Sequence, residues 1–567
     1  MTAKRIVVDP ITRIEGHLRV EVVVDENNVI QDAYASSTLW RGIELILQGR
    51  DPRDAGLLTQ RICGVCTYSH YRVGIEAVEN ALGITPPYNA ILTRTLMSQA
   101  LFLHDHIVHF YHLHGLDWCD ITQALAADPR KASDLAFKYA DFPIATGADE
   151  LKAVQAKLKG FVEEGYLGPF ANAYWGHKTY RLNPEQNLIV LSHYLKALAV
   201  QRNAAQMMAL FGGKQPHPQS LVVGGVTCVM DLLNPNRLGE YLTKFEEVSD
   251  FMNRAYYADV KMAAEAYISE DSVLKGAGIK NFMSARDFQI SRNEWLFDSG
   301  IVLDGDLSRV HDIDEDQITE EATHSWYQDN EALHPYQGKT APNYTGFRDG
   351  DTVQGRAKVL DESGKYSWVK APRYNGRAVE VGPLAQMLVG YARGNDKVQK
   401  VVNDFLQETG VPVPALFSTL GRTAGRMLQT KLIADHGKTT LLNLVENLKV
   451  DQETCAPYVI DNRREYRGRG MGDVPRGMLS HWVRIRNGVI DNYQCVVPST
   501  WNASPIDAAG QHGPYEAALI GIQLADPTQP LEIIRTIHSF DPCLACAVHV
   551  LDYRGQELAN YQVNPGQ

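Results

Sequence analysis

Two short stretches near opposite ends of the chain decide its fold: RICGVCTYSH at residues 61–70 and DPCLACAVH at residues 541–549. Each contains a Cys-x-x-Cys motif, which alone is compatible with a redox dithiol, half of a zinc site or chance. The four sulfur atoms belong to Cys63, Cys66, Cys543 and Cys546. The other four cysteines are single and scattered, so the two motifs together indicate one four-thiolate metal site.

Four thiolates form a soft ligand set that suits zinc, an iron-sulfur cluster, or nickel and iron. The motifs of a structural zinc site usually lie close together, because the metal closes a small loop. Here nearly the whole chain separates the two pairs. This spacing favours a buried catalytic centre between the two ends of a large fold, with a structural zinc as the alternative.

Composition excludes some classes of protein. The chain has 567 residues, of which 44% are hydrophobic and 22% are charged, with a formal net charge of -12. This is the balance of a globular protein, and the acidic charge argues against nucleic-acid binding. Apolar stretches are shorter than the roughly 20 residues of a membrane-spanning helix. Residues 1–10 have no apolar segment, so we expect no signal peptide of the chain's own.

Periodicity predicts a helix-dominated α+β fold in which a central bundle of long helices carries peripheral β-hairpins. Hairpins are expected at 18–35 and at 482–497, where Asn487-Gly488 is a strong turn signal. Helices are expected at 40–47, 89–116, 149–165, 184–210, 237–267, 383–408, 414–434 and 532–540. Gly, Asp, Asn and Pro are frequent from 269 to 375, which predicts an irregular region with short strands.

We expect one compact catalytic unit with five regions. The first is an N-terminal hairpin with the first helix (1–50), and the second contains the first cysteine motif and the bundle (51–268). An irregular α/β region (269–381) comes next. The fourth has the C-terminal helices, hairpin and second cysteine motif (382–549), and the fifth is a C-terminal extension (550–567).

The two cysteine stretches resemble the N- and C-terminal signatures of the large, catalytic subunit of nickel-iron hydrogenases, of the dimeric uptake type. Further similar segments are DPITRIEGH (9–17), WRGIE (40–44), HDHIVHFY (104–111), VPRGMLSHW (474–482) and VVPSTWN (496–502). The resemblance therefore runs from end to end. It implies the fold of that subunit and reversible heterolytic cleavage of dihydrogen to protons and electrons, in the uptake direction.

The resemblance implies a nickel-iron centre with carbon monoxide and cyanide on the iron. All four motif cysteines would bind nickel, Cys66 and Cys546 would also bridge to iron, and Cys63 and Cys543 would be terminal ligands. Residue 543 is cysteine, so the selenium variant is not expected.

Other site residues follow from the same resemblance. Arg476 would overhang the metals with two carboxylates beside it, and Glu15 would take protons from the thiolate. Without the resemblance, Arg476 reads as a surface arginine and Glu15 as the partner of Arg13 or Arg19. The remaining predicted contacts are Asp105 and Asp541 near Arg476, Pro498 and Ser499 at the cyanides, and His70 at a bridging sulfur.

Glu44, His549 and the backbone carbonyl of Cys495 match the ligands of a magnesium-type ion, for which oxygen donors are suitable. The run at 104–114 contains five histidines, which do not share one helix face and are read mostly as packing and hydrogen-bonding residues. His217 is a weaker candidate for a place near a partner's iron-sulfur cluster.

The expected partner is a small subunit with iron-sulfur clusters, because the remaining cysteines are too few and too scattered for an electron relay. The resemblance also implies nickel-insertion proteins and a maturation protease that removes residues 550–567 after His549. Dihydrogen is the expected substrate, and membrane contact is expected only through partners. We expect a periplasmic location by export with the small subunit, with the cytoplasm as the alternative. A rival is a respiratory-complex-like subunit of the same fold without nickel, although such relatives generally lack the full cysteine set.

Overall fold

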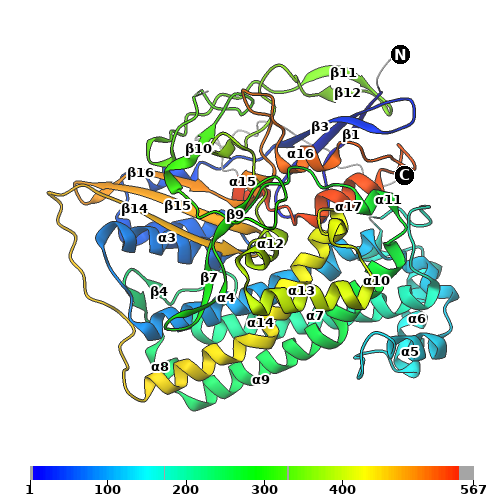
Figure 1. Cartoon of the computed structure of the whole chain (residues 1–567), viewed down its shortest axis with the longest axis horizontal. Helices are drawn as coiled ribbons and strands as arrows, with labels where there is room; N and C mark the ends of the chain where they lie inside the picture. Colours follow the sequence, from blue (N-terminus) through cyan, green and yellow to red (C-terminus); the bar gives the residue numbers. More distant parts are fainter. Residues whose placement is uncertain (1–3, 172, 329–330, 548–567) are drawn as a thin grey trace.

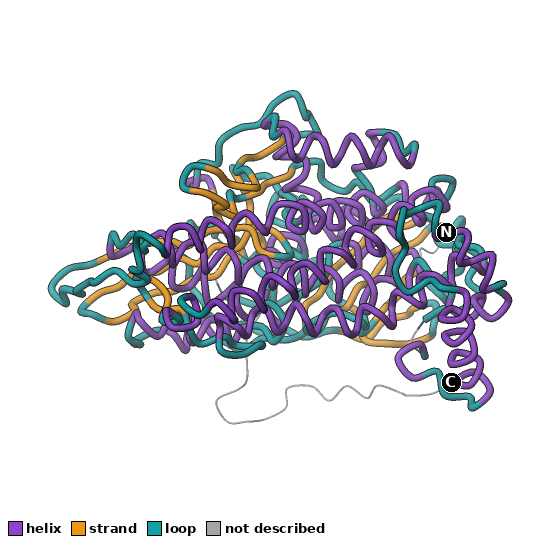
Figure 2. The backbone as a smooth tube through the Cα atoms, turned by 90° about the horizontal axis from the view of Figure 1, so that it is seen from below, coloured by secondary structure: helices purple, strands orange, loops and turns teal. Residues whose placement is uncertain are grey.

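The computed structural model describes residues 4–171, 173–328 and 331–547. Four long helices form its centre: α4 (Tyr88–Val108), α7 (Pro184–Gly212), α9 (Pro235–Phe251) and α14 (Thr419–Leu448). Helix α4 packs against α7 and α14, and α9 packs against the same two helices. The long helices lie side by side across the molecule (Figures 1 and 2). The predicted central bundle is confirmed.

Local sequence explains where the bundle helices begin and end. Asn183 caps α7 in a capping box with Gln186, and Pro184 occupies the first helical position. The helix ends at Gly213, which adopts the left-handed conformation. Helix α4 passes into a π-helix, His109–His114, so the histidine run lies partly on irregular backbone. Such π segments occur often at functional sites.

Three predicted helices were wrong in extent. The helix expected at 383–408 is divided into α12 (Pro383–Arg393) and α13 (Asp396–Thr409). The division occurs because Gly394 is left-handed and Asn395 caps the second helix. The one expected at 414–434 is α14, which begins at Thr419 and continues to Leu448, and the one at 40–47 is only α1 (Ile43–Leu47). The helix expected at 237–267 is confirmed in extent, as α9, a π turn and α10 (Tyr257–Tyr267) in unbroken succession.

Both predicted hairpins are confirmed, and each gains a strand that the sequence analysis missed. Strands β2 (Leu18–Val24) and β3 (Ile30–Ser37) form an antiparallel sheet with β1 (Lys4–Val8). Strands β15 (Gly477–Arg486) and β16 (Val489–Val496) form another with β14 (Tyr466–Val474). The Asn487-Gly488 turn has both φ angles positive, as the sequence predicted.

Helix α3 (Thr67–Leu82), which follows the first cysteine motif, covers the β14–β16 sheet. A Cβ atom at Gly468 or Gly470 would lie 2.2 or 2.1 Å from the α3 backbone, so glycine permits this close approach. The largest hydrophobic core extends from the bundle to this helix and includes three motif cysteines, Cys63, Cys66 and Cys543. The metal motifs therefore lie at the junction of bundle and sheet.

The region at 269–375 consists mainly of short two-stranded ladders, as predicted. They are β6 (Phe282–Ser284) with β9 (Gly300–Val302), β7 (Asp287–Ser291) with β8 (Glu294–Phe297), β10 (Ile318–Glu321) with β13 (Ala371–Tyr374), and β11 (Arg348–Thr352) with β12 (Gly355–Val359). The remaining short elements are α2 (Ala55–Thr59), α5 (Pro129–Ala136), α6 (Ala148–Glu163), β4 (Leu221–Val222), β5 (Gly225–Val226), α8 (Val229–Leu232), α11 (Asp271–Leu274), α15 (Pro498–Asn502), α16 (Pro514–Leu519), α17 (Leu531–Ser539) and α18 (Leu544–Ala547).

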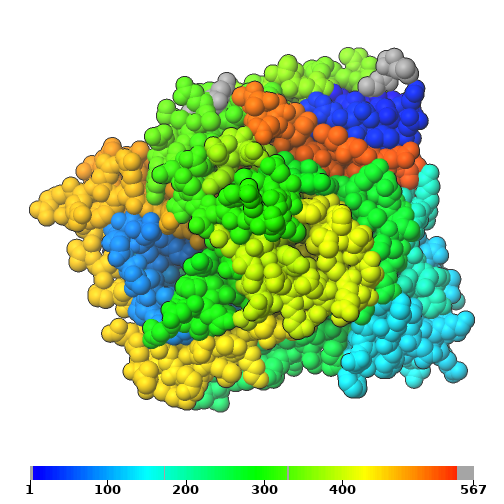
Figure 3. Space-filling model, in the orientation of Figure 1, coloured from blue at the N-terminus to red at the C-terminus, as the bar shows by residue number. Residues whose placement is uncertain are grey.

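The N-terminal strands lie against the C-terminal region of the described chain. Ile30 donates its N–H to the carbonyl of Ile522, and β3 packs against α16. Figure 3 shows the N-terminal strands, in blue, directly beside the orange and red C-terminal region. Among the described residues, no helix combines the length and the apolar character needed to span a membrane.

Candidate metal centre

The fold brings three thiols of the two motifs together. The Sγ atom of Cys543 lies 3.4 Å from that of Cys63 and 3.9 Å from that of Cys66, and all three side chains are buried. Two thiolates bound to one ion at about 2.3 Å stand about 3.3–3.8 Å apart for bond angles of about 90–110°. The cluster therefore fits a single metal-binding site. Cys546 lies on α18 beside it, and its side chain lies outside the described part.

Short local elements position these thiols. Cys66 directly precedes α3, and the backbone N–H groups of Val65 and Cys66 donate to the Cys63 Sγ. On the other side of the site, Cys543 directly precedes α18. Amide donors of this kind stabilise a thiolate, the form in which cysteine binds metals.

The Glu15 carboxylate contacts the Cys543 thiol. The Cys543 Sγ donates to Glu15 Oε2 at 3.3 Å, and the N–H of Ala545 donates to the same oxygen at 3.1 Å. Backbone bonds in both directions hold residue 15 against Pro542 and Leu544. Burial and the charge of Cys63 raise the pKa of Glu15 to about 7. Glu15 is therefore placed to exchange a proton with this sulfur.

The alternative partners of Glu15 are engaged elsewhere. Arg13 pairs with Asp117, and Arg19 pairs with Asp9 and Glu21. Gly16, the residue after Glu15, packs against the second cysteine motif. It has a φ of +83°, and a Cβ there would lie 2.4 Å from the Ala545 nitrogen. Only glycine permits this approach of the N-terminal segment to the second cysteine motif.

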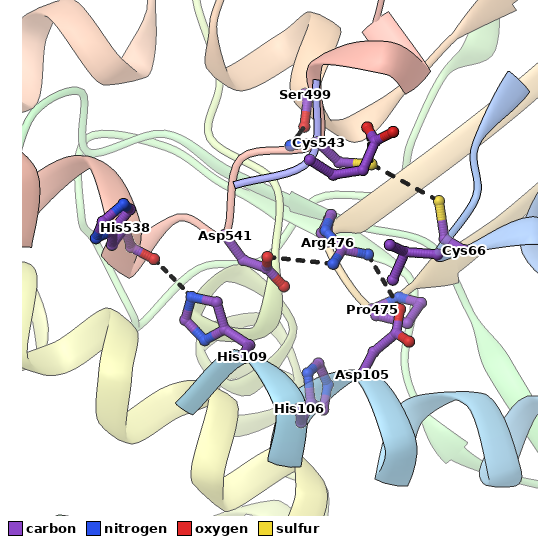
Figure 4. A network of polar contacts seen from close by, with 12 residues as sticks. Cys66, Asp105, His106, His109, Pro475, Arg476, Ser499, His538, Asp541 and Cys543 are labelled. Atoms are coloured by element: carbon purple, nitrogen blue, oxygen red, sulfur yellow. Dashed lines mark hydrogen bonds and ion pairs between the residues drawn. The ribbon is translucent and has the colours of Figure 1, made fainter. Parts of the chain in front are cut away.

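Arg476 is buried in the turn between β14 and β15, which overturns the alternative of a surface arginine. Its Nη1 lies 3.1 Å from Asp105 Oδ2, and its Nη2 lies 3.2 Å from Asp541 Oδ1. Figure 4 shows the guanidinium between the Asp541 carboxylate and the cysteine sulfurs. Carboxylate and thiolate charges outweigh burial and hold the pKa of Arg476 well above its usual value. Both predicted carboxylates are therefore beside the arginine.

A second buried arginine, Arg426 on α14, was missed by the sequence analysis. Its Nη1 contacts Asp541 Oδ2 at 3.2 Å and donates to the carbonyl of Pro475 at 2.9 Å. The Asp541 carboxylate thus bridges two guanidinium groups. The available sequence signal was the pair Arg422 and Arg426 at a four-residue step within one helix.

Three further predicted residues lie around the thiols. Ser499 Oγ accepts the N–H of Cys543 at 3.1 Å, and Pro498 is the first residue of α15. His70 Nδ1 lies 3.1 Å from His481 Nε2, and His481 Nδ1 lies 2.8 Å from the Tyr493 hydroxyl. Burial lowers the pKa of His70 to about 4, which keeps the ring neutral. His481 was not singled out from the sequence.

The predicted oxygen site is partly assembled. Glu44 is buried, its Oε1 accepts the N–H of Cys495 at 2.9 Å, and its Oε2 accepts the hydroxyl of Thr340. The carboxylate and the backbone of residue 495 are therefore adjacent. His549, the third predicted ligand, lies outside the described residues.

The histidine run makes hydrogen bonds, as expected. His106 bonds to Gln429, His109 to the carbonyl of His538, and His112 to the carbonyl of Tyr194. His114 pairs with Asp117. The weaker candidate, His217, donates its N–H to Thr67 at the start of α3, close to the first motif.

Comparisons with known proteins agree with this geometry. The chain matches the family model described as nickel-dependent hydrogenase over residues 41–549, and one described as HoxL-like over residues 5–36. It is 67% identical to the quinone-reactive Ni/Fe-hydrogenase large chain of Wolinella succinogenes, with 99% of this chain and 98% of that protein covered. It is 45% identical to the uptake hydrogenase large subunit of Rhizobium leguminosarum bv. viciae, with the same coverage. The reduced-state structure of the Ni-Fe-Se hydrogenase from D. vulgaris Hildenborough has a TM-score of 0.75 at 32% identity, with 97% of this chain and 100% of that chain covered.

Proposed function

Since the chain belongs to the nickel-dependent hydrogenase family as a large subunit, we propose that it cleaves dihydrogen heterolytically in the uptake direction. The observation that carries this proposal is the buried thiol cluster with a carboxylate on one side and a buried arginine on the other. Together these groups supply soft metal ligands, a proton acceptor and a fixed positive charge.

We propose that Cys63, Cys66, Cys543 and Cys546 would hold the nickel, and that Cys66 and Cys546 would also hold the iron. The sulfur separations and the buried surroundings of the three described thiols support this assignment. When bound, a nickel-iron centre supplies Lewis acidity and accepts electrons. Carbon monoxide and cyanide on the iron belong to the same proposal, with Pro498 and Ser499 beside the cyanides.

The protein's own residues handle the proton. The Cys543 sulfur holds it first and passes it to Glu15 Oε2, which lies 3.3 Å away within hydrogen-bond reach. Arg476 presents a permanent charge to the cluster, and Asp105 and Asp541 fix the orientation of its guanidinium. His70 supports the bridging sulfur from a neutral ring held by His481.

We propose a magnesium-type ion at Glu44, the carbonyl of Cys495 and His549. The contact between the Glu44 carboxylate and the backbone of residue 495 supports this site. The hard oxygen donors match a magnesium ion.

Transfer of electrons away from the metal centre requires a second protein. Among the described residues, Cys119, Cys228, Cys455 and Cys495 lie apart and form no further cluster of metal-binding side chains with Cys63, Cys66 and Cys543. We therefore propose a heterodimer with a small subunit that carries iron-sulfur clusters. Exposed apolar side chains of Leu45, Ile46 and Leu57, just before the first motif, support a partner surface there.

Location and maturation are further parts of the proposal. We propose that the heterodimer works on the periplasmic side and touches the membrane only through other partners. Nickel-insertion proteins would load the site, and a maturation protease would remove residues 550–567. The five-region division of the chain likewise stays a prediction.

The decisive experiment is an infrared spectrum of the purified heterodimer together with metal analysis. Metal-bound carbon monoxide and cyanide absorb where protein does not, so we expect bands of both, with nickel and iron present. One zinc and no nickel in a sample cleaved after His549 would refute the proposal. Absence of the metals from an uncleaved sample would mean only that maturation had not finished. Cleavage after His549 is therefore verified first by mass spectrometry.

A further inference from the structure

A closed circuit of hydrogen bonds begins and ends on the short segment that leads into Arg476. It runs from Asp473 on β14 through side chains of α12, α14 and α4, and returns to the backbone at Pro475. Its members, which we name the turn-holding ring, are Asp473, Gln386, Gln429, His106, Arg426 and the carbonyl of Pro475. Figure 4 shows His106, Asp105 and Pro475 close to Arg476.

Arg426 determines which group donates and which accepts in every hydrogen bond of the ring. Arg426 has donors only, so its Nη1 donates to Nδ1 of His106 at 3.1 Å. That ring nitrogen is therefore an acceptor, and Nε2 carries the hydrogen and donates to Gln429 Oε1 at 2.6 Å. Arg426 thus fixes the tautomer of His106 and the orientation of the Gln429 side-chain amide.

The two glutamines complete the circuit. Gln429 Nε2 donates to Gln386 Oε1, and Gln386 Nε2 donates to Asp473 Oδ2 at 2.6 Å. The five ring side chains are at most 1% exposed, so water does not compete for these bonds. In such surroundings a broken link leaves a buried polar group without a partner, which is costly.

The position of the turn-holding ring indicates which part of the backbone it constrains. Both of its ends lie within the segment 473–475, and Arg476 is the next residue. Arg426 also binds Asp541, which is a partner of Arg476. The ring therefore constrains the backbone of the turn and the carboxylate that orients the guanidinium.

We propose that Gln386, Gln429, His106 and Arg426 are positioning residues that hold the Pro475-Arg476 turn over the thiol cluster. The inference rests on the proposed function, in which Arg476 faces the reacting centre. The four residues act through the turn.

The test substitutes Gln429→Met in the heterodimer, which removes the amide and nearly keeps the volume. Hydrogen–deuterium exchange is measured on a peptide that contains residues 474–478. We expect its exchange to accelerate about tenfold, because one buried link is lost. We expect kcat for dihydrogen oxidation to fall about tenfold or more, with KM little changed, because a small displacement of a positioned group slows the chemical step.

Gln99→Met is the matched control. Gln99 is fully buried on α4 and donates to Thr440 on α14 at 2.9 Å, so it joins the same two helices outside the ring. We expect the control to leave the exchange of residues 474–478 and kcat unchanged. Equal acceleration in both variants would show a general loss of packing and would overturn the proposal.

Gln386→Met tests the ring without changing α14, and the double variant tests its closure. Once one hydrogen bond of the ring is lost, the other no longer constrains the turn. The exchange rate of the double variant should therefore equal that of the faster single variant. Additive effects, or an unchanged turn in either single variant, would contradict the ring. Because exchange does not depend on activity, a heterodimer without hydrogenase activity would refute the proposed function while the ring is still tested.

Discussion

Replacement of His512 by glutamine should make the stability of this protein depend less on pH. His512 Nδ1 lies 3.0 Å from Glu516 Oε2, and its Nε2 lies 3.3 Å from Asp32 Oδ1. Both partners are acceptors, so both ring nitrogens carry hydrogen. Burial opposes the charged ring, but the hydrogen bonds to the two carboxylates outweigh it and raise its pKa from 6.5 to about 9. The cluster joins β3 to α16, because Glu516 also accepts the N–H of Ala35.

The rise in the pKa of His512 from 6.5 to about 9 corresponds to about 3.4 kcal/mol in the free energy of unfolding. The His512 side chain is 22% exposed, and solvent screening reduces this to about 2 kcal/mol. The folded pKa is raised, so the contribution is fully present below pH 6.5 and is lost as the pH rises through 9. Unfolding entropy of about 2.1 cal/mol/K per residue converts about 2 kcal/mol into roughly 2 °C for a chain of this length.

The assay is thermal unfolding of the wild type and His512→Gln from pH 6 to pH 10. We expect a difference in Tm at pH 6 that exceeds the difference at pH 10 by about 2 °C. His311→Gln, at an exposed histidine of the irregular region, is the control for the substitution itself. A difference for His512→Gln that does not change with pH would refute the reasoning, because the charge of the ring would then contribute nothing.

Three further predictions concern the metal centre. Glu15→Gln keeps the size of the side chain but cannot accept the proton of Cys543, so dihydrogen oxidation should fall about 10²- to 10⁴-fold with nickel and iron content unchanged; wild-type rates would remove Glu15 from the relay. Cys543→Ala should abolish nickel retention in elemental analysis, because it removes a sulfur that lies 3.4 Å from that of Cys63 and 3.9 Å from that of Cys66; a full complement of nickel would contradict the ligand assignment. Glu44→Gln should release the magnesium-type ion while nickel stays bound, and unchanged magnesium content would place that ion elsewhere.

Much of this protein was determined by its sequence alone. The two Cys-x-x-Cys motifs predicted one shared site from residue type and separation, and the three described thiols meet within 4.8 Å. The Asn487-Gly488 hairpin and the ends of α7 depend on the preferences of a few neighbouring residues, so local chemistry was sufficient. The resemblance to nickel-iron hydrogenase large subunits was confirmed, because long motifs of chemically specific residues rarely match by chance.

Only the tertiary structure decided which further polar residues support that site. Arg426, His481 and Gln429 carry no sequence pattern that names their partners, because each bonds to a residue far away along the chain. From its position alone Arg476 reads as a surface residue, and the resemblance alone predicted it at the metals; in the structure it is buried. Sequence specifies the groups that bind metal, since ligand chemistry belongs to the residue itself. The charge, tautomer and orientation of the groups around them depend on distance and burial, which only the folded chain sets.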